Sequence, residues 1–170
     1  MMRVIGFDPG TATTGYGVVE ESGNRVFHLE HGVIRTPAGM HFAERLRLLS
    51  KECTELIARI APDAIAIEKL FFKKNVTSGI GVAQARGVIA LAAAEYGARI
   101  GEFGPSEVKL AVTSNGRAAK AQVQQMIKII LNLDAIPKPD DAADGLAIAL
   151  CQIYSGARIQ LLENLENRAG

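Results

Sequence analysis

The chain has 170 residues, of which 48% are hydrophobic and 22% charged, and its formal net charge is +1. This composition is ordinary for a soluble globular protein whose single domain contains a substantial core. No apolar run is long enough to cross a membrane, and the N-terminus lacks the features of a signal peptide, so we expect a cytoplasmic protein that is not associated with a membrane.

The first predicted element is a strand over residues 3–8. Its apolar residues end in Asp8, and Pro9-Gly10 then breaks the strand. This order places Asp8 at the carboxyl end of a buried strand, where open α/β sheets bind their ligands. Glycines at positions 10, 15 and 17 allow the next segment to fold back as a hairpin close to Asp8. Taken alone, the stretch fits a buried aspartate satisfied by the turn equally well.

The next segments alternate between strands and helices. Residues 16–20 and 26–35 are predicted to complete an antiparallel meander. Residues 41–61 have apolar side chains at helical spacing, which predicts an amphipathic helix that ends at Pro62. Residues 64–68 are apolar on both faces, as is typical of a central parallel strand, and this strand also ends in an acid, Glu68.

The second half of the chain is predicted to be mainly helical. A basic loop over residues 69–77 leads to a helix with a stripe of small residues, which favours close packing within the chain or, alternatively, a dimer interface. A strand over 99–103 precedes a short helix over 106–112, a helix around residues 123–131 and a last helix from Asp140. The order βββαβαβααα predicts an α/β fold. We expect one domain over residues 1–155 and a C-terminal tail over 156–170 that frays.

Charge and cysteine placement add two constraints. Residues 69–138 contain ten of the nineteen Lys and Arg residues but four of the eighteen acids. This excess predicts a local basic surface, which has functional weight only if it surrounds an acidic site. Cys53 and Cys151 fall on apolar helical faces and are expected to be buried free thiols.

Four carboxylates are expected to converge at the edge of the sheet where the two acid-ending strands finish. If the two acid-ending strands are parallel neighbours, Asp8 and Glu68 lie side by side. Asp141 and Asp144 are three residues apart and project from one face of the last helix, which Asp140 is expected to cap. Four carboxylates in one cleft stay ionised only around cations, and hard oxygen ligands favour Mg²⁺ or Mn²⁺. Two such ions can activate water at a phosphodiester and steady its leaving oxygen.

Motifs along nearly the whole chain resemble one family. They are I-G-F-D-P-G with T-G-Y-G-V, A-I-E-x-x-F, A-Q-A-R-G ending at Gly87, and D-A-A-D-x-L-A-I-A. Together and in this order they resemble RuvC-type Holliday-junction resolvases, which are bacterial nucleases of recombination and repair. The resemblance implies an RNase H-like fold, in which helices flank a five-stranded mixed sheet made of an antiparallel meander and two parallel strands.

The resemblance also implies the chemistry and the partners. It assigns the metal-binding catalytic acids to Asp8, Glu68, Asp141 and Asp144, here called the four acids, with two Mg²⁺ or Mn²⁺ ions per subunit. It implies a homodimer that cuts a four-way DNA junction by paired symmetric nicks, a geometry that suits a two-fold substrate. The family's usual partners are the branch-migration proteins RuvA and RuvB.

Other positions are candidates for DNA contact. Phe71 matches an aromatic that stacks on an unpaired base, although Phe72 beside it leaves the assignment open. Lys109 and Lys120 match basic positions beside the active site. General phosphate-contact candidates are Lys73, Lys74, Arg86 and Arg117. For each of these side chains, a core or solvated position is the simpler structural explanation.

Three departures from the family pattern stand out. Lys69 replaces the usual glutamine after Glu68. Its positive charge would either weaken metal binding or add a phosphate contact. Gly145 replaces the usual alanine, at a cost of about 1 kcal/mol to an isolated helix. A Ser-Asn-Gly turn at residues 114–116 replaces a more glycine-rich one. None of these departures removes one of the four acids.

Other functions compete with the resolvase hypothesis. Actin-like kinases and chaperone ATPases open with a similar strand, but they need two such domains and a second phosphate loop. A YqgF-type nuclease with the same fold, acting on structured RNA, is the closer alternative. A junction-binding protein without catalysis is a third alternative, and it would not need so much negative charge facing a polyanion.

Overall fold

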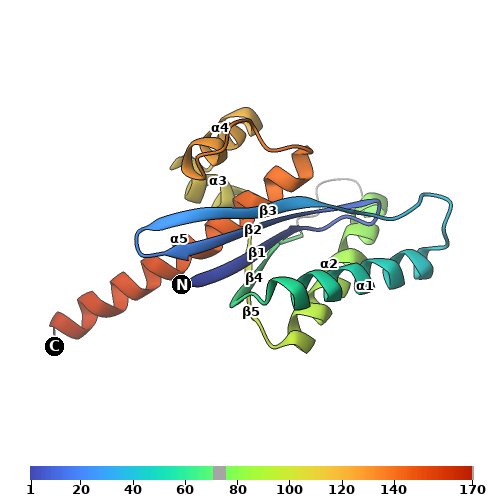
Figure 1. Ribbon diagram of the computed structural model, residues 1–170, viewed down its shortest axis with the longest axis horizontal. Helices are drawn as coiled ribbons and strands as arrows, with labels where there is room; N and C mark the ends of the chain where they lie inside the picture. Colours follow the sequence, from blue (N-terminus) through green and yellow to red (C-terminus); the bar gives the residue numbers. More distant parts are fainter. Residues whose placement is uncertain (71–75, 170) are drawn as a thin grey trace.

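The computed structural model describes the backbone of residues 1–70 and 76–169, and the side chains of residues 1–70 and 79–156. Its centre is a five-stranded sheet with the order β3-β2-β1-β4-β5 (Figure 1). The strands are β1 (Met2–Asp8), β2 (Thr13–Ser22), β3 (Arg25–Arg35), β4 (Ala64–Glu68) and β5 (Arg99–Phe103). Strands β1 to β3 form the antiparallel meander, while β4 runs parallel to β1 and to β5. The mixed sheet expected from the sequence is confirmed.

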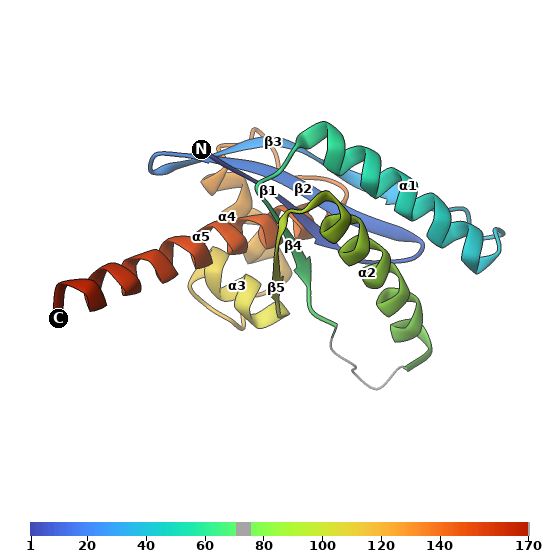
Figure 2. The ribbon, with the colours of Figure 1, turned by 90° about the horizontal axis from the view of Figure 1, so that it is seen from below.

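Helices cover both faces of this sheet. They are α1 (Phe42–Ile60), α2 (Val76–Tyr96), α3 (Pro105–Thr113), α4 (Lys120–Ile130) and α5 (Asp140–Ala169). Helices α1 and α2 lie on one side, and α3, α4 and α5 lie on the other (Figure 2). The protein has one hydrophobic core on each face of the sheet, and alternate residues of β1 contribute to each: Val4 packs towards α5 and Ile5 packs towards α1.

Local sequence explains why the elements end where they do. Helix α1 buries an apolar stripe that ends at Ile60, and Ala61 then adopts a left-handed backbone conformation with φ 51° before Pro62. Burial raises the pKa of the Cys53 thiol to about 12 and that of the Cys151 thiol to about 11. Both cysteines are free and buried, as expected.

The first half of α5 lies directly on β1 and β2, through glycine contacts. A Cβ built on Gly15 would come within 1.9 Å of the Asp141 carbonyl oxygen, and one on Gly17 within 2.4 Å of the Leu146 nitrogen. A Cβ on Gly145 would come within 2.5 Å of the Tyr16 carbonyl carbon. An alanine at position 145 would therefore require α5 to lie farther from β2. Gly145 therefore permits the close approach, and the lower helix propensity of glycine is the cost that accompanies it.

Helix α5 begins at Asp140, as expected, but its cap differs from the expectation. Asp140 is its first helical residue, and the carbonyl of Pro139 accepts the first helical hydrogen bonds, from the Ala142 and Ala143 amides. The expected cap at Asp140 is thus wrong, because its carboxylate accepts a bond from Lys138 Nζ instead.

The helical backbone of α5 continues beyond Ser155 to Ala169. The division into a domain over residues 1–155 and a tail remains a prediction. Over the part of the chain that the structure describes, no helix combines the length and apolarity needed to cross a membrane.

Candidate active site

Three elements bring the four acids to one end of the sheet. The parallel register of β1 and β4 pairs Phe7 with Ile67, so Asp8 and Glu68 emerge from neighbouring strands at the same edge. Helix α5 presents Asp141 and Asp144 from its first turns, held close by the glycine contacts with β2. One carboxylate oxygen from each of three acids lies within 4.8 Å of the others: Asp8, Asp141 and Asp144.

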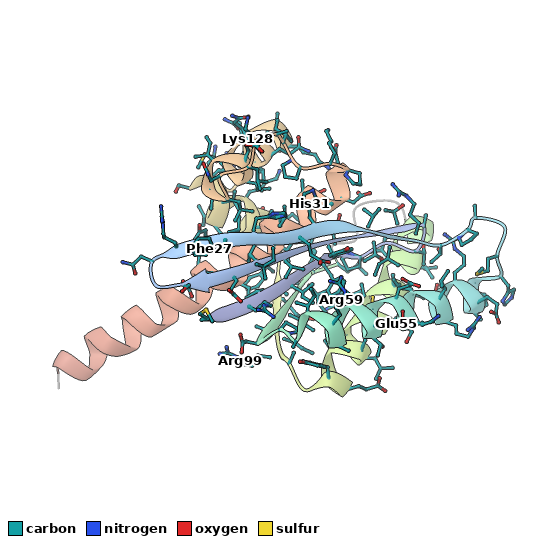
Figure 3. All side chains as sticks on the ribbon, in the orientation of Figure 1. Phe27, His31, Glu55, Arg59, Arg99 and Lys128 are labelled. Atoms are coloured by element: carbon teal, nitrogen blue, oxygen red, sulfur yellow. The ribbon has the colours of Figure 1, made fainter. Side chains whose placement is uncertain are left out.

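Glu68 joins the site through a shared cavity. A cavity of about 210 Å³ is lined by Asp8, Glu68 and Asp144, together with Lys109 of α3 and Lys120 of α4. Its remaining walls are apolar and come from α3, α4 and α5. Glu68 therefore faces the same space as the three clustered aspartates, although it lies outside their tight cluster. A larger cavity of about 540 Å³ lies between α1 and β3, where Figure 3 shows Glu55 and Arg59, and it contains none of the four acids.

Burial and the charges of neighbouring acids oppose the ionisation of Asp8, Glu68 and Asp144. Burial, followed by the charges of Glu68, Asp144 and Asp141, raises the pKa of Asp8 from 3.8 to about 7. Burial is also the main cause of the raised pKa of Glu68 and of Asp144. A divalent cation relieves this repulsion, and the donors are the hard oxygen ligands that Mg²⁺ and Mn²⁺ prefer. The site therefore fits such an ion.

Lysines border the acidic cavity. Lys120 Nζ lies 2.9 Å from Asp144 Oδ2 and 3.8 Å from Asp140 Oδ2. Burial lowers the pKa of Lys120, but the hydrogen bond and charge of Asp144 with the charges of Asp140 and Asp141 outweigh it, so the net shift is upward. Lys109 lines the same cavity. Both lysines thus stand beside the acids, as the resemblance implied.

The side chain of Lys69 turns towards α3. Its Nζ lies 3.5 Å from Glu107 Oε2, and the Glu107 carboxylate also accepts the Gly104 amide at 2.6 Å. Lys69 is not among the residues that line the acidic cavity. Although Lys69 directly follows Glu68, its ammonium group therefore does not neutralise the charge of the four acids.

The remaining DNA-contact candidates are not brought together. Arg86 of α2 forms an ion pair with Glu102 of β5, which satisfies its charge within the fold. Arg117 is exposed, in the turn between α3 and α4, and its amide donates to Asn115 Oδ1 at 3.0 Å. Four candidates lie outside the described residues: Phe71, Phe72, Lys73 and Lys74.

Sequence reasoning missed one residue that shapes the site. Thr14 is fully buried, and its hydroxyl donates to the Gly10 carbonyl at 2.6 Å. This bond closes the turn that directly follows Asp8. The only signal in the sequence is a threonine four residues after Gly10, which is too common to single out.

The raised pKa of Asp8 predicts an unusual dependence of stability on pH. Between 3.8 and about 7, the metal-free folded protein binds more protons at Asp8 than the unfolded chain does. Stability should therefore fall as pH rises through this window. We expect the Tm measured in EDTA to decrease from about pH 5 to about pH 8, and the Asp8→Asn variant to show a flatter profile. A Tm profile unaffected by Asp8→Asn would contradict this assignment.

Comparison with known proteins gives a consistent result. The family model described as "Crossover junction endodeoxyribonuclease RuvC" matches residues 4–152. A protein of that name from Rubrobacter xylanophilus is 52% identical over 152 residues, covering 89% of this chain and 85% of the relative. Another, from Ruminiclostridium cellulolyticum, is 52% identical over 163 residues and covers 96% and 98% of the two chains.

Solved structures show the same similarity. The structure described as "T. thermophilus RuvC in complex with Holliday junction substrate" superposes with a TM-score of 0.87 at 34% identity, covering 92% of this chain and 95% of the other. The yeast mitochondrial Holliday junction resolvase Ydc2 superposes with a TM-score of 0.75 at 16% identity, covering 99% of this chain and 86% of the other. The latter likeness supports the fold alone.

Proposed function

Because the chain belongs to the RuvC family of crossover junction endodeoxyribonucleases, it is a Holliday-junction-resolving endonuclease, and we propose that the four acids form its catalytic centre. The observation that supports this assignment is the cluster of Asp8, Asp141 and Asp144 oxygens within 4.8 Å at the end of the sheet. Glu68 completes the set from the adjacent strand, facing the cavity that Asp8 and Asp144 also line.

The family implies dependence on a divalent metal, and we propose two Mg²⁺ or Mn²⁺ ions per subunit. When bound, such ions supply an activated water and charge stabilisation at the leaving oxygen. Helix α5 presents Asp141 and Asp144 from its first turns, where both carboxylates can serve as ligands. Because the remaining cavity walls are apolar, the carboxylates would interact more strongly with a bound cation there than in open water.

Lysines would hold the phosphate of the strand being cut. Lys109 and Lys120 line the acidic cavity from α3 and α4, where a scissile phosphate would enter. We assign Arg117 a weaker backbone contact because it is exposed in the turn between these helices. Arg86 is a poorer candidate because Glu102 already neutralises it. The proposed stacking by Phe71 or Phe72 and the phosphate contacts of Lys73 and Lys74 rest on the family resemblance.

The experiment that tests this function is cleavage of a labelled synthetic four-way junction. The reaction would be run with Mg²⁺, with Mn²⁺ and with EDTA, beside linear duplex DNA and structured RNA. We expect paired symmetric nicks on the junction that depend on metal. Cutting of RNA with an intact junction would instead support the YqgF-type alternative, which the comparisons with DNA-junction nucleases do not favour. Junction binding without cutting would support a non-catalytic protein, against which the complete set of acids argues.

We propose that the enzyme is a homodimer and that the outer face of α2 forms its interface. This helix buries Ala85, Ile89 and Ala93 against the sheet, but leaves Ile80 53% and Leu91 58% exposed. Gly87 and Ala94 are exposed on the same side, at spacings that align them with Ile80 and Leu91 along one helical face. Large exposed apolar side chains in a row are typical of a protein interface.

A substitution on this face tests the dimer. We expect Leu91→Glu to shift the protein from dimer to monomer, because a buried carboxylate without a partner opposes association. Ile129→Glu on α4 is the matched control, since Ile129 is 61% exposed outside the proposed interface. Sedimentation equilibrium over a range of concentrations would measure both variants. A wild-type monomer at all concentrations, or an unchanged dimer in Leu91→Glu, would overturn the proposal.

Two further proposals follow from the family. We propose that RuvA and RuvB deliver the junction to this enzyme, as the resemblance implies. We also propose a cytoplasmic site of action, because bacterial chromosomal DNA lies there.

A further inference from the structure

Two arginines lie at the same end of the sheet as the four acids. The antiparallel registers pair Asp8 with Gly15, Gly15 with Val33 and Thr13 with Arg35. Val33 is therefore level with Asp8 on β3, two strands away, and Arg35 lies two residues farther along β3. From the spacing of strands and the rise per residue, the two Cα atoms are about 12 Å apart. Arg35 is exposed at the end of β3.

The second arginine is fixed to the loop that follows Asp8. Arg45, in the first turn of α1, donates from Nε to Thr36 Oγ1 at 2.8 Å. The Thr36 hydroxyl in turn donates to the Thr11 carbonyl, and the Thr36 amide donates to the Ala12 carbonyl at 3.1 Å. This chain of bonds holds the Arg45 guanidinium beside the loop between β1 and β2.

The positive charges of this pair are not neutralised by neighbours. Among residues 1–70 and 79–156, neither Arg35 nor Arg45 forms an ion pair, whereas Arg47 pairs with Glu44 and Arg59 with Glu30. Arg35 also lines the large cavity that contains Glu52 and Glu55 of α1, without an ion pair to either. The N-terminus of the 19-residue helix α1 adds partial positive charge beside Arg45.

Arg45 and the two cavity lysines lie on opposite faces of the sheet, and Arg35 stands on the edge strand β3, where it lines the cavity between β3 and α1. Lys109 and Lys120 come from α3 and α4, and Arg45 comes from α1, which covers the other face. A strand positioned for cutting at the end of the sheet would extend past the acids towards either side. An anionic backbone leaving on the α1 side would meet positive charge that is already held in place.

We propose that Arg35 and Arg45 form a second phosphate-binding surface, which holds the DNA backbone of the junction on the α1 side of the active site. This proposal rests on the proposed function, because it requires that a DNA junction be bound with its scissile phosphate at the four acids. Such a surface binds by charge and carries no sequence information, because phosphate contacts do not read bases.

The test measures the affinity for a junction of proteins that also carry Asp8→Asn, because this substitution is expected to prevent cutting while leaving binding intact. Dissociation constants would be determined over a series of salt concentrations for Arg35→Gln, Arg45→Gln and the double variant. We expect the double variant to bind about tenfold more weakly and the slope of log affinity against log salt to fall by about 2. Each single variant should lower the slope by about 1.

Arg25→Gln is the matched control, because β3 runs from Arg25 to Arg35 and thus has an exposed arginine at each end. Its 11 residues separate the two positions by about 33 Å. Figure 3 shows Phe27, near Arg25, at the opposite end of β3 from the loop that leads to α1. We expect Arg25→Gln to bind like the parent protein.

A conservative variant separates charge from structure at position 45. Arg45→Lys keeps the positive charge but loses the Nε bond to Thr36, so it should retain most of the affinity if phosphate binding is the role. Equal affinity and slope for Arg35→Gln and Arg25→Gln would overturn the proposal, as would equal losses in Arg45→Lys and Arg45→Gln. Failure of Asp8→Asn itself to bind any junction would instead overturn the proposed function.

Discussion

Replacing Asp8 with asparagine is expected to lower junction cleavage by about 1000-fold or more while leaving junction binding intact. Asparagine has the shape of aspartate but no negative charge, so it cannot serve as a full ligand at a cationic centre. Losing even one well-placed electrostatic group commonly costs 100-fold to 1000-fold in rate. The measurement is the single-turnover rate of nicking on a labelled junction with saturating Mg²⁺.

The loss of activity in Asp8→Asn should not come from unfolding. The pKa of Asp8 is raised to about 7 by burial and by three neighbouring carboxylates, so its charge opposes folding of the metal-free protein at neutral pH. Removing that charge should leave the Tm in EDTA unchanged or higher. A variant that loses both activity and stability would show that the carboxylate has a structural role.

Asp140→Asn is the matched control for the same chemical change. Asp140 lies one residue before Asp141 on α5, but its carboxylate pairs mainly with Lys138 Nζ at 2.8 Å, is 3.8 Å from Lys120 Nζ and lies outside the cluster of three aspartates. We expect its cleavage rate to stay within about threefold of wild type, because a surface ion pair contributes little. Equal losses in Asp8→Asn and Asp140→Asn would contradict the assignment of the catalytic acids.

Replacing Gly15 with alanine is expected to lower both stability and activity. The new Cβ would lie 1.9 Å from the Asp141 carbonyl oxygen and 2.3 Å from its carbonyl carbon, and both atoms belong to the backbone of α5. Overpacking against a fixed backbone costs up to about 3 kcal/mol of unfolding free energy. Relief of the clash would move Asp141, and a shift of about 1 Å in a catalytic group can cost about 100-fold in rate.

Denaturant unfolding and junction cleavage would measure the two effects of Gly15→Ala. Gly39→Ala is the control, because a Cβ on Gly39 meets nothing within 4 Å and its φ is not in the left-handed region. The control should unfold at the wild-type denaturant concentration and cut at the wild-type rate. If Gly15→Ala behaves like Gly39→Ala, then α5 does not depend on this close approach to β2.

Sequence patterns predicted the elements of the fold well because each pattern reflects one local cause. Strand β4 and strand β5 have the expected bounds, and α1 begins and ends within one residue of its expected range. The apolar stripe of α1 and the breaks at Pro9 and Pro62 act over a few residues, so they are visible without tertiary contacts. Helix α5 begins at Asp140, as expected, but the capping role expected of Asp140 was wrong, because its carboxylate accepts a bond from Lys138 Nζ.

Lys69 and Gly145 illustrate what sequence patterns left open. Both were departures whose effect on the site could not be decided, because the effect depends on where a side chain points or how closely two backbones pass. The structure turns Lys69 towards Glu107 and brings Gly145 onto Tyr16. In both cases the deciding contact joins residues far apart in the sequence.

The sequence by itself determined the fold class, the family and the residues that could hold a metal. Acids at the ends of two apolar strands and at one helix start are features of short segments, and short segments are what a linear pattern records. Tertiary structure alone decided that three aspartate oxygens meet within 4.8 Å while Glu68 lines the adjoining cavity, and that Arg86 is already paired. Distances between side chains depend on how α5 and α2 pack on the sheet, and that packing is set by all the contacts together.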